Sequence, residues 1–246
     1  VETCVEKGIN SLENLALIPG TVGAAPIQNI GAYGREFKDF CESVRVWDIA
    51  SKSFKTFTQD ECHFGYRNSV FKTDLMNKAM ITQVSLKISK DWSPNTSYGE
   101  LKELINPTAK EIYEKVIEIR TAKLPSVDDI GNAGSFFKNP FVSSEHMEKL
   151  KNVYPDIPHF KNGESFKLSA AWLIDRGGLK KEQVGQVACH SRQPLVLVNK
   201  GNATGEDVSA FARLVMNRVK TQFDIDLEPE VRFIGKNGPV ELKANG

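Results

Sequence analysis

The run Gly131–Pro140 presents one serine hydroxyl, that of Ser135, among small residues. Glycine has no Cβ, so the main chain there can approach a bound molecule closely and adopt torsions that other residues avoid. Phe136–Phe137 could exclude water from a ligand, and Lys138 with Asn139 could bind an anionic or polar group. This composition suits a site where an oxygen must reach a ligand, but Gly, Asn and Ser are also typical of ordinary tight turns.

Two other segments supply the remaining groups of an acid–base site. Phe64–Ser69 contains Arg67, whose planar guanidinium can bind a carboxylate through two hydrogen bonds. Glu228–Gly235 alternates charged and apolar residues, which predicts a strand that ends beside something polar, and its Glu230 could position or share a proton. The ordinary alternatives are a surface salt bridge for Arg67 and a structural ion pair between Glu230 and Arg232.

With these three groups in view, the chain resembles the UDP-N-acetylenolpyruvoylglucosamine reductases, flavoenzymes that complete UDP-N-acetylmuramate for peptidoglycan. The resemblance covers nearly the whole chain, from Leu12–Gly20 through Pro26–Gly34 to the segment around Glu230. It implies FAD and NADPH as cofactors and UDP-N-acetylglucosamine enolpyruvate as substrate. In the family reaction NADPH reduces FAD, hydride then passes to C3 of the substrate, and C2 is protonated. The flavin supplies the hydride chemistry, while the protein orients the reactants and stabilises charge.

By this resemblance Arg67, Ser135 and Glu230 occupy the three catalytic positions of the family. Arg67 would stabilise the negative charge that hydride addition pushes into the substrate carboxylate, and Glu230 would share a proton with that carboxylate. Ser135 would protonate C2, which requires a very basic intermediate because an alcohol is a weak acid. The three side chains are therefore expected to meet around one enolpyruvyl group.

The resemblance also implies binding residues. Tyr98, in Thr96–Leu101, matches the tyrosine of a substrate-covering loop in one subtype of the family, although a buried aromatic hydroxyl would also explain it. The other substrate-binding residues implied are Lys123, Asn139 and Gln193. The segment Leu15–Gly34 carries almost no charge, and a buried structural loop would have the same composition. FAD contacts, mainly through main-chain groups, are expected from Pro19, Gly20, Gly23, Gln28, Asn29, Ile30, Gly31, Ala32 and Tyr33.

The chain begins with Val1 rather than Met, within what is predicted to be the tail of an amphipathic helix. Full-length members of the family carry an N-terminal subdomain whose Gly- and Ser-rich loop holds the FAD phosphates. No such loop precedes Leu12, so we expect this chain to lack part of its cofactor site.

Length and charge restrict the fold and the partners. A chain of 246 residues can bury a substantial core, and helices and strands that interleave without regular alternation predict the α+β class. Lys and Arg total 32 against 31 Asp and Glu, so there is no net field to attract nucleic acid or an anionic membrane. No apolar run approaches the roughly 20 residues that span a bilayer. We expect a soluble monomer that acts on small molecules.

The cysteines are Cys4, Cys41, Cys62 and Cys189, widely separated and without a C-x-x-C pair. This spacing disfavours both a disulfide framework and a zinc site, so no metal is expected. A reducing cytoplasm fits this pattern.

Hydrophobic periodicity predicts the main elements. Two strands joined by a turn are expected within Ser43–Phe57, followed by a strand Met80–Ile88 that alternates on one face, and a helix from Pro107 to Ala122 is expected to link two domains. Further elements are a helix capped by Ser144, a helix Leu168–Arg176, a strand Leu195–Val198 and a long helix Gly205–Phe223 whose apolar stripe packs in the core.

Three segments are expected. Residues 1–123 would form the FAD-binding domain with its linker helix, residues 124–225 the substrate-binding domain, and residues 226–246 a return to the FAD domain. Two other functions stay open: a non-catalytic sugar-nucleotide-binding module that has lost flavin, and an FAD-linked oxidase of a small alcohol, which would not need the Arg, Ser and Glu trio.

Overall fold

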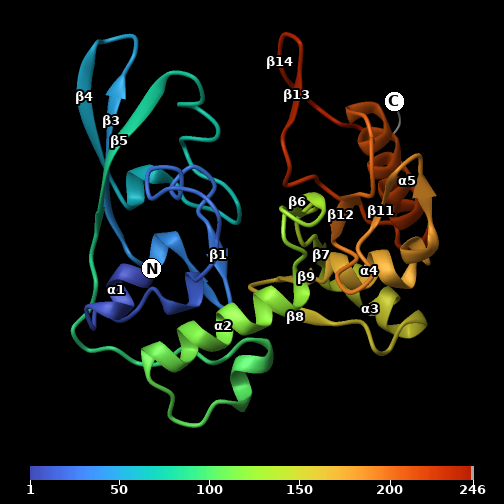
Figure 1. Ribbon diagram of the computed structural model, residues 1–246, viewed down its shortest axis with the longest axis horizontal. Coiled ribbons are helices and arrows are strands. Elements are labelled where there is room, and N and C mark those ends of the chain that lie inside the picture. Colours follow the sequence, from blue (N-terminus) through green and yellow to red (C-terminus); the bar gives the residue numbers. More distant parts are fainter. Residues whose placement is uncertain (245–246) are drawn as a thin grey trace. The chain divides into compact units, whose positions relative to one another are not determined.

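The computed structural model describes residues 1–244, and the chain divides into two compact units, residues 1–120 and 121–246 (Figure 1). Both units mix helices with antiparallel strands, which confirms the predicted α+β class. The assignment of segments to cofactor and substrate stays a prediction.

The first unit contains one short helix, several strands and most of a longer helix. In chain order they are α1 (Glu2–Glu6), β1 (Gly31–Ala32), β2 (Arg35–Glu36), β3 (Cys41–Asp48), β4 (Ser53–Thr58), β5 (Ala79–Leu86) and α2 (Ala109–Lys123). Short 3-10 helices cover Glu13–Leu15, Phe37–Asp39, Asp60–Cys62 and Gly99–Glu103. The first helix and the β3–β4 pair confirm the sequence expectations.

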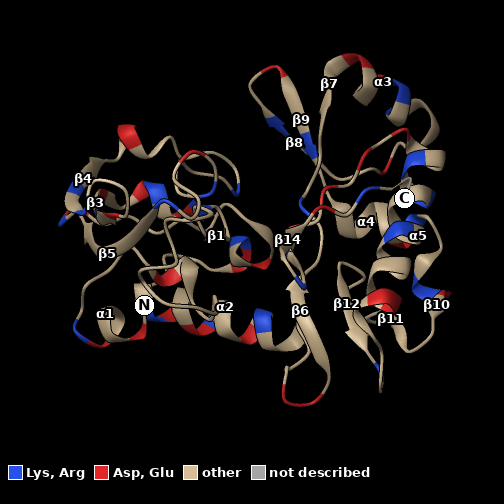
Figure 2. Cartoon of the chain, turned by 90° about the horizontal axis from the view of Figure 1, so that it is seen from above, with Lys and Arg blue, Asp and Glu red and all other residues tan. Residues whose placement is uncertain are grey.

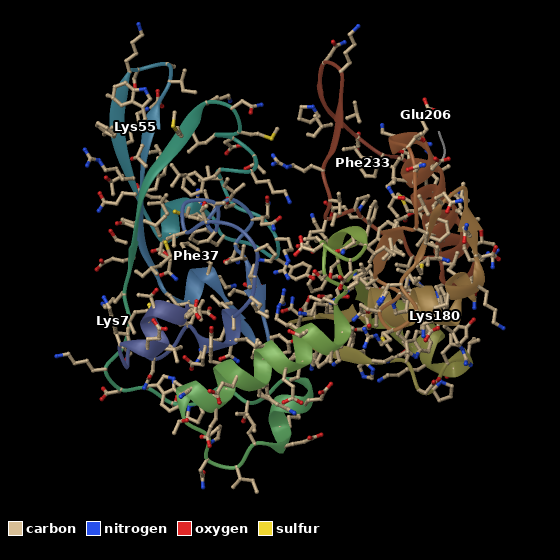
Figure 3. The ribbon with its side chains drawn as sticks, in the orientation of Figure 1. Lys7, Phe37, Lys55, Lys180, Glu206 and Phe233 are labelled. Atoms are coloured by element: carbon tan, nitrogen blue, oxygen red, sulfur yellow. The ribbon has the colours of Figure 1, made fainter. Side chains whose placement is uncertain are left out.

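The main sheet of this unit has the order β4-β3-β5, with antiparallel neighbours (Figure 1). Val44 and Val46 of β3 are almost fully buried, and they pack in a cluster with Phe37, which lies inside the unit (Figure 3). Burying large apolar side chains on one face is what holds such a sheet in place. The outward face carries Trp47 packed edge-on against Phe54, with ring centroids 4.9 Å apart.

The single-face alternation predicted for Met80–Ile88 is wrong. Val44 pairs with Val84, but Val46 pairs with Ile81, because one additional residue is inserted in β5 at this point. Such a bulge moves the side chains beyond it to the other face of the sheet. Met80 is consequently 60% exposed, whereas Val84 packs against the buried cluster.

Helix α2 begins at Ala109 rather than at Pro107. The N–H of Thr108 donates to Oε2 of Glu111 at 2.7 Å, and the N–H of Glu111 donates to Oγ1 of Thr108 at 3.2 Å. This capping box defines the first turn, so Pro107 lies just outside the helix. The buried face of α2 carries Ala109, Ile112, Val116 and Ile119.

The described part of the second unit contains two sheets, a hairpin, three α-helices and the short 3-10 helix Leu179–Lys181. The first sheet, in the order β10-β11-β12-β6, joins β6 (Gly131–Ser135), β10 (Gln183–Val184), β11 (Val187–Cys189) and β12 (Val196–Asn199). The second, in the order β7-β9-β8, joins β7 (Phe141–Ser143), β8 (His159–Asn162) and β9 (Ser165–Leu168). The hairpin is β13 (Phe233–Gly235) with β14 (Gly238–Val240), and the helices are α3 (Ser144–Val153), α4 (Ala170–Arg176) and α5 (Gly205–Phe223).

Helix α5 has the bounds that the sequence predicts, and its apolar stripe lies in the core as expected. Phe211, Ala212, Val215 and Val219 are fully buried. They belong to one cluster with residues of β9, α4 and β11, so α5 is the central packing element of this unit.

The starts of α3 and α4 differ from prediction by one or two residues. Ser143, not Ser144, caps α3, because its side chain accepts from the N–H of His146 at 3.2 Å. Leu168 ends β9 instead of beginning α4, and Ser169 caps that helix by accepting from the N–H of Trp172. In both places a serine stands where a strand passes directly into a helix. At 143–144 either of two adjacent serines satisfies the preference for serine at a helix cap, so the sequence alone could not choose between them.

Charge is mixed over both units, with Lys and Arg interspersed among Asp and Glu (Figure 2). Within residues 1–244 all the cysteines are free thiols, and no group of His, Cys, Asp and Glu could hold a metal ion. A bilayer-spanning helix needs a long apolar stretch, and none of the helices in this described range has one.

A capping box identifies a site for testing the stability of α5. The side chain of Thr204 accepts from the N–H of Asp207 at 3.2 Å, and the N–H of Thr204 donates to the Asp207 carboxylate at 2.8 Å. We expect Thr204→Ala to lower the free energy of unfolding by about 1 kcal/mol, measured by urea denaturation. Ser209→Ala, which removes a hydroxyl in the helix body, is the control and should change stability much less. Equal losses would contradict a capping role.

Candidate active site

A bulge in β6 sets the position of Ser135. Ser135 pairs with Val196 of β12, but the next pair along the ladder joins Asn132 with Val198, so β6 carries one additional residue. Gly134, inside the bulge, has φ 70°, and a Cβ built on it would meet nothing within 4 Å. Glycine is therefore required by backbone torsion and not by lack of space. Bulges of this kind re-aim a side chain, and here Ser135 ends the strand exposed.

Phe136 and Phe137 anchor the residues on either side of them. Both rings are almost fully buried, 3% and 1% exposed, so the expectation that they shield a ligand is wrong: they are core residues. The N–H of Phe136 donates to the carbonyl of Leu195 at 2.8 Å, and its carbonyl accepts from the N–H of Glu230 at 2.8 Å. Ser135 and Glu230 are thus held side by side through the main chain of one buried residue.

The segment that carries Glu230 lies along the residues after Ser135. Phe137 and Pro229 form an isolated antiparallel bridge, and the N–H of Lys138 donates to the carbonyl of Glu228 at 2.9 Å. The Lys138 ammonium also forms an ion pair with the Glu228 carboxylate. The strand predicted over Glu228–Gly235 is wrong for its first half, where only this bridge forms. The charge of Lys138 is paired with that of the Glu228 carboxylate.

A hollow of about 400 Å³ opens beside Glu230. It is lined by Glu228, Pro229, Val231, Arg232, Phe233, Pro239, Val240, Glu241 and Leu242. Phe233 packs against Phe136, with ring centroids 5.8 Å apart, and the label in Figure 3 marks its place at the base of the β13–β14 hairpin. One cation, two carboxylates and several apolar side chains share this wall, as in many small-molecule sites.

Two of the expected substrate-binding residues have structural contacts of their own in this unit. Asn139 Oδ1 accepts from the N–H of Ala170 at 2.9 Å, which attaches Asn139 to the first turn of α4. The carbonyl of Gln193 accepts from the N–H of Val196, the residue that pairs with Ser135. Lys123 is the last residue of α2 and is exposed. These placements neither require nor exclude a role in binding, which stays a prediction.

Arg67 lies in the first unit, at the tip of a tight turn. The N–H of Gly65 donates to the carbonyl of Asn68 at 3.0 Å, and the N–H of Asn68 donates to the carbonyl of Gly65 at 3.2 Å. Arg67 has φ 53°, a left-handed conformation that costs a residue with a Cβ roughly 1–2 kcal/mol. Its Nη2 donates to the carbonyl of Gly31 at 2.8 Å, so the guanidinium is fixed against a residue of the expected cofactor segment. Strain of this kind concentrates at functional sites.

The expected cofactor segment has an irregular backbone. Leu17, Gly20, Asn29, Tyr33 and Gly34 all have positive φ. A Cβ on Gly31 would lie 2.9 Å from the carbonyl oxygen of Arg35, so only glycine fits there. Among the other expected contacts, Pro19 and Gly20 are exposed, whereas Gly23, Gln28, Ile30, Ala32 and Tyr33 are partly buried.

Asn29 holds this segment together with its side chain. Its Nδ2 donates to Oε2 of Glu36 and to the carbonyl of Gly65, both at 3.0 Å, and its Oδ1 accepts from the N–H of Lys38 at 2.9 Å. Asn29 is fully buried. The side-chain amide of Asn29 is thus occupied within the first unit, and a contact of Asn29 with a cofactor stays a prediction.

Arg120 was not among the residues predicted from the sequence. Its Nη2 donates to the carbonyl of Leu17 at 3.2 Å, while its Nε is buried and has no hydrogen-bond partner among the described residues. Burial lowers the pKa of the Arg120 guanidinium, and burial also raises the pKa of the nearby Tyr33 hydroxyl. A signal was present, since Arg120 follows Val116 by four residues on the apolar side of α2.

Tyr98 precedes the 3-10 helix Gly99–Glu103 and is 38% exposed, so the alternative of a buried hydroxyl is wrong. Its ring packs edge-on against Tyr33, with centroids 6.0 Å apart. Tyr98 therefore lies next to one of the expected cofactor residues within the first unit.

The structure thus brings together two groups of predicted residues. Ser135 and Glu230 lie next to each other in the second unit, which also contains Asn139 and Gln193. Arg67, Tyr98 and the cofactor segment belong to the first. The meeting of Arg67 with Ser135 and Glu230 around one ligand stays a prediction.

Comparison with known proteins gives one consistent result. A sequence model described as "UDP-N-acetylenolpyruvoylglucosamine reductase, C-terminal domain" matches residues 125–234. Curated proteins named UDP-N-acetylenolpyruvoylglucosamine reductase are 48% identical over 95% of this chain in Aliivibrio fischeri and 47% over 99% in Vibrio cholerae. The corresponding protein of Pseudoalteromonas translucida is 46% identical over 99% of the chain. This chain spans 67%, 70% and 73% of those three proteins, respectively.

Among solved structures, the chain is similar to the crystal structure of UDP-N-acetylenolpyruvylglucosamine reductase from Thermus caldophilus. The TM-score is 0.63 and the sequence identity 26%, over 93% of this chain and 66% of that one.

The bulge in β6 yields a stability prediction. Gly134→Ala would force a residue with a Cβ into a left-handed conformation, and we expect the free energy of unfolding to fall by roughly 1–2 kcal/mol. The control is Gly131→Ala in the same strand, where φ is negative and the new Cβ would lie 3.5 Å from Cβ of Asn199, an ordinary contact. Denaturant titration of both variants measures the difference. The bulge would not depend on Gly134 if the two variants were equally stable.

Proposed function

Because the chain belongs to the UDP-N-acetylenolpyruvoylglucosamine reductase family, we propose that it reduces UDP-N-acetylglucosamine enolpyruvate to UDP-N-acetylmuramate, a precursor of peptidoglycan. The observation that carries this proposal is the identity of 46–48% with relatives of that name over 95–99% of the chain. The proposed cofactors are FAD and NADPH, and the proposed location is the cytoplasm.

The first unit has features that fit part of a flavin site. Glycines and left-handed residues between Leu15 and Gly34 leave the main chain open to close approach, and Gly31 lies where no Cβ fits. The buried, unpartnered Nε of Arg120 lies in the same region and suits an anionic group of the cofactor. FAD, when bound, would supply the hydride chemistry that no side chain can supply.

Arg67 is proposed to stabilise the charge that develops on the substrate carboxylate. A guanidinium stays protonated at any relevant pH and offers two parallel donors to a carboxylate. The hydrogen bond from Nη2 to the Gly31 carbonyl orients the group before any ligand binds. Preorganised charge is effective because it does not have to reorient when the reaction occurs.

Ser135 is proposed to donate its Oγ proton to C2 of the enolpyruvyl group, and Glu230 to share a proton with the adjacent carboxylate. The main-chain hydrogen bonds of Phe136 hold these two residues next to each other, which supports a joint role. Tyr98, Lys123, Asn139 and Gln193 are proposed to bind the rest of the substrate, with Lys123 and Tyr98 at its diphosphate.

Ligand binding by the purified chain tests the function. We expect saturable binding of UDP-N-acetylglucosamine in calorimetry and quenching of FAD fluorescence on titration with the chain, followed by substrate-dependent oxidation of NADPH. UDP-sugar binding without FAD binding would favour the sugar-nucleotide-binding module. Flavin binding with oxidation of a small alcohol and no benefit from NADPH would favour the oxidase. If the chain bound neither FAD nor UDP-N-acetylglucosamine, the proposal would be contradicted.

The role of Ser135 is tested in the FAD-loaded chain by separating the two half-reactions. We expect Ser135→Ala to leave reduction of flavin by NADPH nearly unchanged and to slow flavin oxidation by substrate by roughly 10²–10⁴-fold, the usual contribution of a positioned acid. Stopped-flow absorbance measures both rates. Ser209→Ala, on the exposed surface of α5, is the control. An equal loss in both half-reactions would show that Ser135 is structural.

A further inference from the structure

We propose that Glu13 and Asn14 are positioning residues for Tyr98, because from inside the first unit they hold the segment of residues 89–97 that leads to it. The inference rests on the proposed function, which assigns Tyr98 to the substrate. The contacts that carry the inference all lie within the first unit.

The segment 89–97 has few features of its own that would keep it in place. None of its residues belongs to a helix or a strand, and none of them is buried. Trp92 packs against a hydrophobic cluster, but only as a partly buried residue at its margin. A segment with so few buried apolar contacts opens at a low free-energy cost unless polar contacts attach it.

Two such attachments are present, and both come from the same short element. Nε1 of Trp92 donates to Oε1 of Glu13 at 2.7 Å, and Nδ2 of Asn14 donates to the main-chain carbonyl of Asn95 at 2.9 Å. Glu13 and Asn14 are consecutive residues of the 3-10 helix Glu13–Leu15. One turn of the first unit therefore holds the segment at two positions, 92 and 95.

The fold keeps these two polar side chains in its interior at a cost. Glu13 is 1% exposed and Asn14 is fully buried. Oε2 of Glu13 accepts from the N–H of Ser11 at 2.7 Å, whereas Oδ1 of Asn14 has no hydrogen-bond partner among the described residues. Burial of polar atoms is unfavourable, most of all where an oxygen stays unpaired. Apolar side chains could fill the same space without that cost, so these two contribute a specific attachment rather than burial.

The amide of Asn14 also reaches the residue against which Tyr98 packs. Its Nδ2 donates to the carbonyl of Tyr33 at 2.9 Å, and the ring of Tyr33 packs edge-on against the ring of Tyr98. One buried side chain thus joins the chain just before Tyr98 to the residue beside it. On the other side of Tyr98, Leu101 is fully buried. Tyr98 therefore stands in a short span whose two ends are fixed.

Loss of either attachment should weaken substrate binding through Tyr98. A side chain that is held in its binding position before the ligand arrives loses less conformational freedom on binding than one that must first be ordered. Glu13 and Asn14 would not touch the substrate themselves, so their contribution to affinity should vanish when the Tyr98 side chain is absent.

The test measures the affinity of the full 246-residue chain for UDP-N-acetylglucosamine by calorimetry. Trp92→Phe keeps an aromatic ring but removes the N–H donor to Glu13, and Asn14→Ser removes the amide. Each should weaken binding by roughly 2–10-fold, which corresponds to about one hydrogen bond. Tyr98→Ala should weaken binding as well. Adding Trp92→Phe to Tyr98→Ala should cause no further loss, since the effect of Trp92 passes through Tyr98.

Limited proteolysis tests the attachment without any ligand. Lys90 is exposed within the segment, and trypsin needs the segment to open locally before it can cut the chain after Lys90. Trp92→Phe and Asn14→Ser should each speed this cut relative to cuts elsewhere in the first unit.

Two matched controls accompany these variants. Trp47→Phe removes an indole N–H from the outward face of β3, and Val46→Ala lowers the stability of the same unit within its sheet core. Both should bind UDP-N-acetylglucosamine as the unsubstituted chain does. Neither should favour the cut after Lys90 over other cuts in the unit.

The outcomes separate this inference from the proposed function. Unchanged affinity in both Trp92→Phe and Asn14→Ser would overturn the inference, and so would a further loss when Trp92→Phe is added to Tyr98→Ala. Both results leave the proposed function intact, because the unsubstituted chain still binds the UDP-sugar. An unchanged rate of cutting after Lys90 would overturn the attachment whether or not a ligand binds. If the unsubstituted chain binds no UDP-N-acetylglucosamine, the positioning role fails together with the proposed function.

Discussion

The main chain of Phe136 connects the two groups on which the proposed chemistry depends. Its N–H is bonded to Leu195 on one side and its carbonyl to the N–H of Glu230 on the other. Because the rings of Phe136 and Phe137 are buried in the largest apolar cluster of the second unit, this stretch cannot shift without exposing core surface. This packing holds Ser135 and Glu230 in place, and both residues remain accessible at the surface. A short exposed segment is thereby positioned by burial of its neighbours.

Left-handed backbone conformations occur at or beside residues to which a role is proposed. Gly134 takes a left-handed torsion inside a bulge directly before Ser135, and Arg67 takes one at the tip of its turn. Each conformation is held by surrounding hydrogen bonds, such as that from Arg67 Nη2 to Gly31. The conformation is costly for Arg67, which has a Cβ, whereas Gly134 adopts it without that cost. The guanidinium of Arg67 is thus oriented by a hydrogen bond within the first unit, which is what the proposed electrostatic role needs.

Some polar residues of the expected sites also hold the fold together. Asn29 uses its whole amide to join three segments of the first unit, and Asn139 uses its Oδ1 to bind the start of α4. Substitution of either residue would change stability together with any binding, so activity loss alone would not identify a ligand contact. Arg120 is the opposite case, because its buried Nε makes no hydrogen bond within the described chain and its burial carries a cost.

The sequence by itself determined the α+β class, helix α5, the strands β3 and β4, and the small-residue run around Ser135. These follow from short-range rules, since hydrophobic period and turn residues act over a few positions. Only the tertiary structure decided the bulge that turns Met80 outward, the burial of Phe136 and Phe137, the ion pair of Lys138 with Glu228, and the orphaned Nε of Arg120. Each of these depends on partners that are distant in sequence, and a pattern read along one segment contains no information about which distant residue will lie opposite it.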